Sequence, residues 1–251
     1  GWSYFPTVKE IAADIDDLGQ IIQLFVLSKQ YQFIDEYCKN TILTALNERV
    51  LSNGGIETWI IPKLNQTSIQ KKQEHFNSTK WGKGPDVEVV ANFIYALVIL
   101  NKTKYDSVIK KSIQYILKKQ NDKGYWKSRW YYGNYYGTYV CLRLLKEFEK
   151  DFSEEIKNGT NYLINTQNKD GGFSIAANEI SDPLSTSFSI LGLKLFLDKN
   201  SKVINKAVKY LNDIQNVNGS WSAVNFIKPK VCEPYKSETL TTAYVLKAIC
   251  S

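Results

Sequence analysis

The sequence predicts an all-α fold built from repeated helical hairpins. Three observations lead to this prediction: a turn motif that occurs three times, a helix-period apolar stretch before each turn, and a second such stretch after it. The motifs are Gln120-Asn-Asp-Lys-Gly-Tyr-Trp126, Gln167-Asn-Lys-Asp-Gly-Gly-Phe173 and Gln215-Asn-Val-Asn-Gly-Ser-Trp221, which begin 47 and 48 residues apart. Self-similarity at such a period is typical of repeat architectures.

Each turn joins two predicted helices. Apolar residues at helical spacing predict helices before the turns over 108–117, 156–164 and 203–214. The same pattern predicts helices after the turns over 136–148, 185–197 and 239–249. Two further helices are predicted over 14–28 and 86–100, within a total of about nine helical stretches.

The turn residues have a mechanical role. Gly124, Gly171 and Gly219 allow the positive φ that a tight turn needs. The glutamine amide can bond to backbone groups at a neighbouring helix end, and the final aromatic ring can pack across helix ends. We therefore interpret the turn as a structural joint. A fourth, degenerate copy is predicted to end at Trp81, with 86–100 as its second helix.

Composition and charge exclude several classes of function. Of 32 basic residues only Arg49, Arg129 and Arg143 are arginine, and the lysines behind the net charge of +7 are spread along the chain. Because arginine is the usual reader of base edges, we expect no nucleic-acid partner. The single histidine, His75, leaves little for a histidine-based metal site or a serine triad. No apolar run is long enough to span a bilayer, so we expect a cytoplasmic protein whose membrane contact is at most peripheral.

The turns resemble the Gln-Trp repeats of squalene-hopene and oxidosqualene cyclases. They resemble, less closely, turns in the β subunits of protein prenyltransferases. All these proteins share an α/α toroid, a ring of helical hairpins, so the resemblance implies this fold for residues 1–251 as a single domain of the terpene cyclase β-domain type. A complete toroid has more helices than this chain, so we expect an incomplete ring that forms the C-terminal part of a longer protein.

A second resemblance covers 124–138. This segment is similar to the Gly-x-Trp-x-x-Arg-Trp-Gly-x-Asn-Tyr-x-Tyr-Gly-Thr stretch of the triterpene cyclases. The positions that match in register are Gly124, Trp126, Arg129, Trp130, Tyr136, Gly137 and Thr138, and Asn134 lies one place after the family asparagine.

A third resemblance lies near the start of the chain. The run Asp14-Ile-Asp16-Asp17, preceded by Gly1-Trp2, is similar to the Asp-x-Asp-Asp motif of class II terpene cyclases. In that family the middle aspartate protonates an alkene or epoxide, so the resemblance implies Asp16 as the acid with Asp14 and Asp17 as partners. Neighbouring carboxylates repel one another as anions, which keeps one proton bound. The alternative is an ordinary helix start, where the same residues serve as N-cap and first-turn acids.

Two positions depart from the family pattern. The acid motif continues Leu18-Gly19, where Thr-Ala is usual. The run Pro85-Asp-Val-Glu-Val-Val90 resembles the Pro-Asp-Val-x-x-His segment whose histidine pairs with the acid, but Val90 stands at the histidine position. Asp86 fits the segment and is predicted among the substrate-binding residues. Glu88 and Asn92 are the polar neighbours that could take the place of the histidine.

The densest aromatic cluster of the sequence is Trp130, Tyr131, Tyr135 and Tyr136. Aromatic faces stabilise cations, so we predict that these rings line a substrate cavity; the alternative is packing at helix ends. The polar segment 235–244 stands where the family has an aromatic-rich one. This favours a shorter or diphosphate-bearing isoprenoid, with Lys228, Lys230, Lys236 or Arg129 near its head group.

These resemblances predict a class II terpene cyclase that converts a polyprenyl substrate, a prenyl diphosphate or related isoprenoid. We expect no cofactor, with Mg²⁺ required only for a diphosphate substrate. One alternative is a non-catalytic toroid that binds or scaffolds, which Val90 and Leu18-Gly19 favour. Another is a prenyltransferase β-like subunit, which is disfavoured because its zinc ligands are not recognisable and Cys232 has no downstream histidine.

Overall fold

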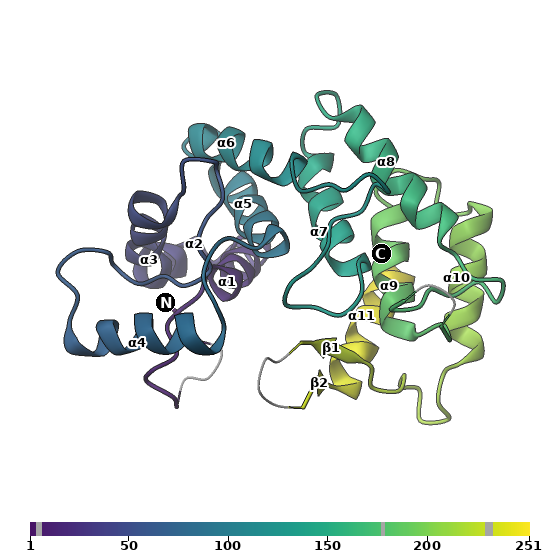
Figure 1. Cartoon of the computed structure of the whole chain (residues 1–251). Coiled ribbons are helices and arrows are strands. Elements are labelled where there is room, and N and C mark those ends of the chain that lie inside the picture. The colour runs from purple at the N-terminus through teal and green to yellow at the C-terminus, as the bar shows by residue number, and fades with distance from the viewer. Residues whose placement is uncertain (4–6, 177–178, 229–232) are drawn as a thin grey trace. The chain divides into compact units, whose positions relative to one another are not determined.

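The computed structural model describes residues 1–3, 7–176, 179–228 and 233–251 (Figure 1). The chain forms two compact units, Gly1–Lys118 and Lys119–Ser251. The described structure is mainly helical, and each helix whose range the sequence predicts is present with its ends shifted by a few residues. This confirms the predicted fold class.

The first unit is centred on two apolar helices. α1 (Ile15–Leu27) packs on α5 (Val87–Asn101), which also packs on α6 (Asp106–Leu117). The segments between α1 and α5 are α2 (Tyr31–Phe33), the π-helix η1 (Ile34–Cys38), α3 (Lys39–Thr44), the π-helix η2 (Ala45–Arg49) and α4 (Ser68–Lys80). Apolar periodicity does not reveal α4, because this helix is polar and begins at a capping box between Thr67 and Gln70.

The second unit is centred on α9 (Pro183–Leu193), in which every residue is buried. The helices α7 (Tyr135–Lys146), α8 (Ser153–Asn165), α10 (Lys202–Asp213) and α11 (Glu238–Cys250) all pack against it. Buried polar side chains of α9 are satisfied within the helix, because the Ser187 and Ser189 hydroxyls donate to the Pro183 and Ser185 carbonyls. Figure 1 shows α7 and α10 on opposite sides of α9. The short strands β1 (Asn225–Ile227) and β2 (Tyr235–Lys236) pair antiparallel before α11.

The three predicted turns share one geometry. In the first, Gly124 has a φ of +92°, and Gln120 Nε2 donates to Gly124 O at 2.8 Å and to Glu155 O of α8 at 2.9 Å. In the second, Gln167 makes the same two bonds, to Gly171 O and to a carbonyl at the start of α10, each at 2.8 Å. A Cβ at Gly124 would lie 2.3 Å from Asn158 O, so the turn requires glycine for space as well as for φ. In these two turns the glutamine therefore fastens the turn to the following helix.

The prediction of a fourth copy ending at Trp81 is wrong, because this copy lies at 50–56. Gly54 has a φ of +88°, and Val50 bridges to Ile56 as Gln120 bridges to Trp126. Val50 has no side-chain amide like that of the glutamine in the other turns. Ser112 Oγ of α6 instead donates to Gly54 O at 2.8 Å. Trp81 only ends α4, which is inserted between this turn and α5.

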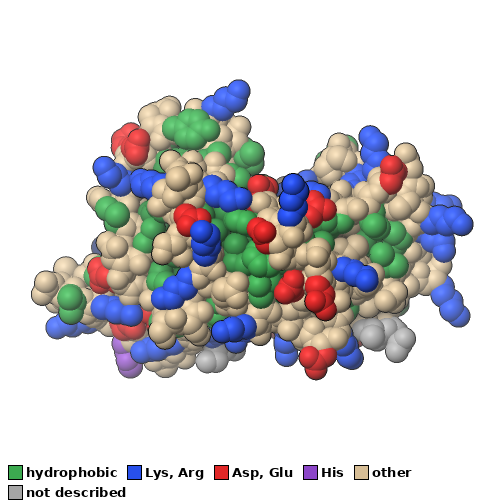
Figure 2. Space-filling model, turned by 90° about the horizontal axis from the view of Figure 1, so that it is seen from above, with side chains coloured by type: hydrophobic (Ala, Val, Ile, Leu, Met, Phe, Trp, Pro, Cys, Tyr) green, Lys and Arg blue, Asp and Glu red, His purple; other side chains and the backbone are tan. Residues whose placement is uncertain are grey.

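The charged surface agrees with a dispersed arrangement of lysines. On the face drawn in Figure 2, Lys and Arg side chains alternate with Asp and Glu and do not gather into one basic patch. Within the described ranges, none of the helices has both the length and the apolar character needed to cross a bilayer.

Candidate active site

The acid motif lies where α1 begins. Asp14 is the N-cap in an extended conformation (φ −124°, ψ 161°), and its Oδ1 accepts a hydrogen bond of 2.8 Å from Asp17 N. The backbone on either side is fixed by segment 57–61, because Ile15 N donates to Thr58 O at 3.0 Å and Ile60 N donates to Ala13 O at 2.8 Å. The backbone thus places three carboxylates within the first turn of α1.

The environment of Asp14 favours a bound proton. Asp14 is 7% exposed, and burial raises its pKa well above the usual range; the charge of Asp17 raises it further and that of Asp16 adds a smaller increase. Backbone N–H groups of Asp17 and Asp16 act in the opposite direction. Burial also raises the pKa of Asp17. These are the causes that keep one carboxyl of a cluster protonated.

Asp16 receives a hydrogen bond from the neighbouring helix. Asn92 Nδ2 of α5 donates to Asp16 Oδ1 at 2.9 Å, and the Asn92 side chain is completely buried. Gln23 Nε2 donates to Asn92 O at 3.2 Å, which ties the same residue to α1. Of the two polar neighbours suggested by the sequence, Asn92 therefore reaches the predicted acid directly.

The close approach of α1 and α5 explains one departure from the family pattern. A Cβ on Gly19 would lie 3.1 Å from Phe93 Cα and 3.2 Å from Phe93 N, both backbone atoms of α5. An alanine at this position would crowd the contact that brings Asn92 to Asp16. Leu18-Gly19 is therefore compatible with a working acid motif.

The second departure, Val90, lies on α5 with its side chain completely buried. The place of the family histidine is thus apolar in this chain. Asp86, which precedes α5, accepts a hydrogen bond of 3.0 Å at Oδ2 from Thr58 Oγ1. Because Thr58 O also accepts from Ile15 N, Asp86 is connected to the start of α1 through one residue.

In the second unit, Tyr131 and Tyr136 belong to one aromatic cluster. Their ring centroids are 4.3 Å apart, and Phe226 of β1 lies 4.5 Å from Tyr131 and 5.2 Å from Tyr136. Phe188 of α9 lies 5.1 Å from Tyr136, and Tyr244 of α11 lies 4.7 Å from Phe188. We refer to these five residues as the Tyr131 cluster.

Tyr135 and Trp130 are separate from this cluster. The Tyr135 ring lies 5.9 Å from Tyr162 and 5.5 Å from Phe173, beside the second turn, and burial raises its pKa. Trp130 has the Arg129 guanidinium over its ring, 5.0 Å from the centroid. The four aromatic residues thus have different surroundings. Trp130 and Tyr131 precede α7, whereas Tyr135 and Tyr136 are successive residues of its first turn and face different directions.

The predicted head-group residues also differ in position. Lys228 Nζ donates to Ser128 O at 3.2 Å and lies over the Tyr132 ring. Arg129 and Lys236 are exposed, and Lys236 is opposite Asn225 in the hairpin. Lys230 and Cys232 lie outside the described residues. Within the described part of the chain, no three His, Cys, Asp or Glu side chains are arranged to hold a metal ion.

Sequence reasoning did not identify Thr58, Phe188, Phe226 or Tyr244 as neighbours of the predicted site. Phe226 reaches Tyr131 because β1 pairs with 130–132, where Tyr132 N donates to Phe226 O at 2.8 Å and Lys228 N donates to Trp130 O at 2.8 Å. No sequence signal marks this pairing, because β1 is only three residues long. The strand β1, which carries Phe226, precedes the polar segment 235–244 discussed above.

The chain belongs to the squalene-hopene cyclase C-terminal domain family, whose model matches residues 1–235. It is similar in structure to a protein from Actinoplanes, with a TM-score of 0.74 and 14% identity over 98% of this chain and 77% of that one. It is also similar to the type II terpene cyclase MstE from Scytonema, with a TM-score of 0.71 and 16% identity over 99% of this chain and 74% of that one. The α/α toroid predicted from the sequence is thereby confirmed.

A third similar structure is the ent-copalyl diphosphate synthase from Streptomyces platensis, with a TM-score of 0.55 and 18% identity. The match covers 82% of this chain and 45% of that one, so the chain spans less than half of that protein. No curated protein sequence matches the chain significantly. Together, the family model and the structures show a class II terpene cyclase-like protein.

Proposed function

We propose that the chain catalyses proton-initiated cyclisation of a polyprenyl substrate, with Asp16 as the general acid. Asp16 gives its proton to a terminal alkene carbon, which leaves a tertiary carbocation on the neighbouring carbon. The π electrons of the next alkene form a carbon–carbon bond to that cation, and the step repeats along the chain. Loss of a proton to a base, or capture of water, ends the sequence.

The observation that carries this proposal is the contact between Asp16 and Asn92 inside the three-carboxylate cluster. The hydrogen bond from Asn92 to Asp16 Oδ1 stabilises the carboxylate that is formed after proton transfer. The dipole of α1 acts in the same direction, because the acid lies at the positive end of the helix. Asn92 is thus proposed as the positioning residue that replaces the family histidine.

The substrate is proposed to be a prenyl diphosphate or a related isoprenoid. MstE, which is similar in fold, has been solved with geranylgeranyl dihydroxybenzoate as its substrate. Aromatic faces such as those of the Tyr131 cluster stabilise cations by about 0.5–2 kcal/mol each. We propose that this cluster stabilises the carbocations, with Trp130 and Tyr135 contributing. We further propose that Asp86 contacts the substrate and that Arg129 and Lys236 bind an anionic head group.

Product analysis tests the proposal. The protein is incubated separately with squalene, farnesyl diphosphate, geranylgeranyl diphosphate and geranylgeranyl dihydroxybenzoate, with Mg²⁺ present in the diphosphate reactions. We expect a cyclic product from one substrate by mass spectrometry, and its loss in Asp16→Asn. A product of unchanged yield in the folded Asp16→Asn variant would contradict the assigned acid.

A second candidate, a non-catalytic toroid that binds an isoprenoid, is favoured by the apolar Val90 at the histidine position. It predicts no product from any of the four compounds by a folded protein. It also predicts saturable binding of one of them, measured by calorimetry, with the same affinity in Asp16→Asn. The two candidates therefore differ in product formation and in the role of Asp16.

A further inference from the structure

Segment 57–61 connects the two carboxylate-bearing helix starts of the first unit. Its backbone pairs with Ala13–Ile15, and Thr58 donates its side-chain hydroxyl to Asp86 Oδ2 at 3.0 Å. The segment also bridges Trp59 to Asp14 in antiparallel register. A displacement of this segment would therefore move the N-cap carboxylate of α1 and the Asp86 carboxylate together.

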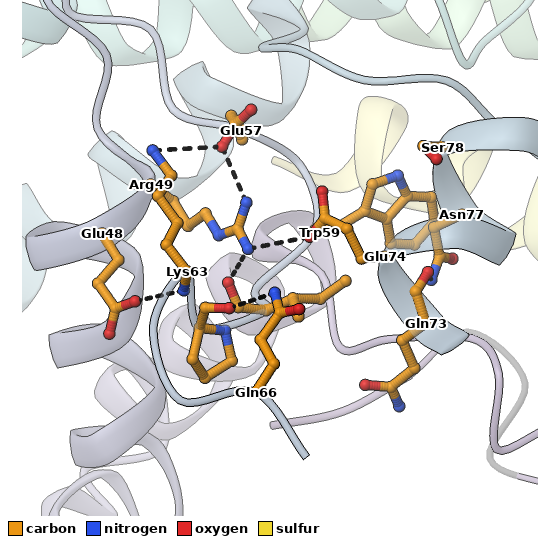
Figure 3. A network of polar contacts seen from close by, with 12 residues as sticks. Glu48, Arg49, Glu57, Trp59, Lys63, Gln66, Gln73, Glu74, Asn77 and Ser78 are labelled. Atoms are coloured by element: carbon orange, nitrogen blue, oxygen red, sulfur yellow. Dashed lines mark hydrogen bonds and ion pairs between the residues drawn. The ribbon is translucent and has the colours of Figure 1, made fainter. Parts of the chain in front are cut away.

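One guanidinium holds this segment at both ends. Arg49 Nη1 donates to Glu57 Oε2 at 3.0 Å, and Arg49 Nη2 donates to the carbonyl oxygen of Ile61 (Figure 3). The backbone adds a bond of 3.0 Å from Glu57 N to Arg49 O. Because Arg49 is the last residue of the π-helix η2, the wider π turn presents its side chain to the segment.

Burial makes this arrangement costly. Arg49 is 4% exposed, and its Nε is buried with no hydrogen-bond partner among the described residues. Removing an ion from water costs several kcal/mol, which a partly satisfied ion pair does not fully return. An apolar residue at this position would make the folded protein equally stable or more stable. The geometric precision of the planar guanidinium is what an apolar side chain cannot supply.

The surroundings of Arg49 leave no room for an organic ligand. The hollow lined by Arg49, Trp59, Glu74, Asn77 and Lys83 has a volume of about 10 Å³. That volume accommodates one water molecule at most. Arg49 Nη2, which donates to Ile61 O, also donates to Glu74 Oε2 of α4 at 3.2 Å. The contacts of Arg49 therefore hold parts of the protein in place and do not form a binding site for an organic ligand.

We propose that Arg49 is a positioning residue of the acid motif, which it controls by clamping segment 57–61. The inference rests on the proposed function of Asp14, Asp16 and Asp17. A displacement of about 1 Å far from the reacting atoms can lower a rate by about 10²-fold. Loosening the clamp would change the geometry of the carboxylates at the start of α1 and, through Thr58, the position of Asp86.

The test uses Arg49→Lys, which keeps the charge but cannot bond to both ends of the segment. We expect kcat to fall about 10-fold, by analogy with misplaced catalytic groups, and any change in KM to report the movement of Asp86. The control is Glu74→Gln. This change weakens the ion pair between Arg49 and Glu74 and leaves the contacts of Arg49 to Glu57 and Ile61 in place. It is expected to lower thermal stability comparably and to keep the wild-type kcat.

A second readout is independent of turnover. NMR titration of protein labelled with ¹³C in its aspartate carboxyl groups follows Asp14 directly. We expect its raised pKa to fall towards the usual value in Arg49→Lys, since a loosened segment admits water, and to stay unchanged in Glu74→Gln. This arm tests the clamp even if the wild type forms no product, so it separates the two proposals.

Two results would overturn the inference. One is a folded Arg49→Lys variant with wild-type kcat and an unchanged Asp14 titration. The other is a Glu74→Gln variant that loses as much kcat as Arg49→Lys, which would show that stability alone is responsible. If Arg49→Lys does not fold, Glu57→Gln weakens the same clamp from its other side, and the same outcomes apply to it.

Discussion

The helices α1 and α9 begin with the same N-cap arrangement and differ in the acidic residues of their first turn. Asp14 and Asp182 are both N-caps in extended conformation, and each accepts a hydrogen bond from the backbone N–H three residues later, at 2.8 Å and 2.7 Å. Each also takes part in an isolated antiparallel bridge, to Trp59 and to Phe173 respectively. Burial raises the pKa of both carboxyls.

The difference lies in the first helical turn. α9 continues with Pro183, Leu184 and Ser185, and its first turn contains no further acid. α1 places Asp16 and Asp17 there, and their charges raise the pKa of Asp14 further. One carboxylate is enough to cap a helix. Capping accounts for Asp14 and Asp182, and the dipole of α1 favours acids in its first turn. Only at α1, however, do neighbouring carboxylates raise the pKa of the N-cap, which is the contrast that the proposed chemistry explains.

The largest expected difference is catalytic. Asp16→Asn should lower kcat about 10³-fold, because general acid catalysis contributes about 10²–10⁴-fold. Asp182→Asn, which exchanges one good N-cap for another, should leave kcat unchanged. Steady-state kinetics of both variants on the substrate identified by product analysis makes the comparison. Equal losses in the two variants would mean that both helix starts have only a structural role.

The next effect concerns the neighbour of the acid. Asn92→Leu removes the donor to Asp16 Oδ1, so the carboxylate formed by proton transfer loses a hydrogen bond of about 1.5–3 kcal/mol. This corresponds to a fall in kcat of about 10–100-fold with little change in KM. Asn168→Leu, at the second turn, is the matched control and should keep the wild-type rate. A wild-type kcat in Asn92→Leu would remove Asn92 from the mechanism.

A smaller effect is the pH dependence of stability. Because the folded state raises the pKa of Asp14, the folded protein holds a proton that the unfolded chain releases at lower pH. The stability from this group is complete below the unfolded pKa and is lost as pH rises through the folded pKa. The loss is about 1.4 kcal/mol for each pH unit that separates the two pKa values. Between about pH 4 and pH 8, the wild type should therefore lose stability relative to Asp14→Asn in urea denaturation.

The same measurement on Asp182→Asn completes this comparison. The pKa of Asp182 is raised by burial and lowered by its hydrogen bonds to the start of α9, with no contribution from another carboxylate. Its pH-dependent loss should have the same sign and be smaller. A larger loss of stability at Asp182 than at Asp14 would mean that burial of Asp182 raises its pKa more than burial and carboxylate repulsion together raise that of Asp14.

The smallest effect compares two helical glycines. Gly19→Ala presses a methyl group on the Phe93 backbone, whereas Gly192→Ala on α9 meets the flexible end of Leu163 at 2.8 Å. Overpacking costs about 1–3 kcal/mol, and alanine returns about 1 kcal/mol of helix propensity. We expect a net loss of about 1 kcal/mol for Gly19→Ala and no loss for Gly192→Ala by urea denaturation. Equal values would mean that α1 and α5 can separate without cost.

The amphipathic and apolar helices could be predicted well from the sequence, because their periodicity is a local property. Periodicity did not predict α4, whose stability comes from a capping box and polar contacts, or the degenerate turn at 50–56. In the site, the three acids were expected on one helix turn and Asn92 was a named candidate. The clamp by Arg49 was out of reach, because its partners Glu57, Ile61 and Glu74 are brought together only by tertiary structure.

The degenerate turn also has a consequence for the order of folding. In the turn at 120–126, the glutamine closes the loop with a partner four residues away, so the bond can form as soon as the chain bends. In the turn at 50–56, the equivalent donor is Ser112, 58 residues further along. Such distant closure carries a larger entropy cost and is slower. The turn at 50–56 therefore gains its side-chain bond to the glycine carbonyl only when α6 docks, whereas the turn at 120–126 can form its equivalent bond locally.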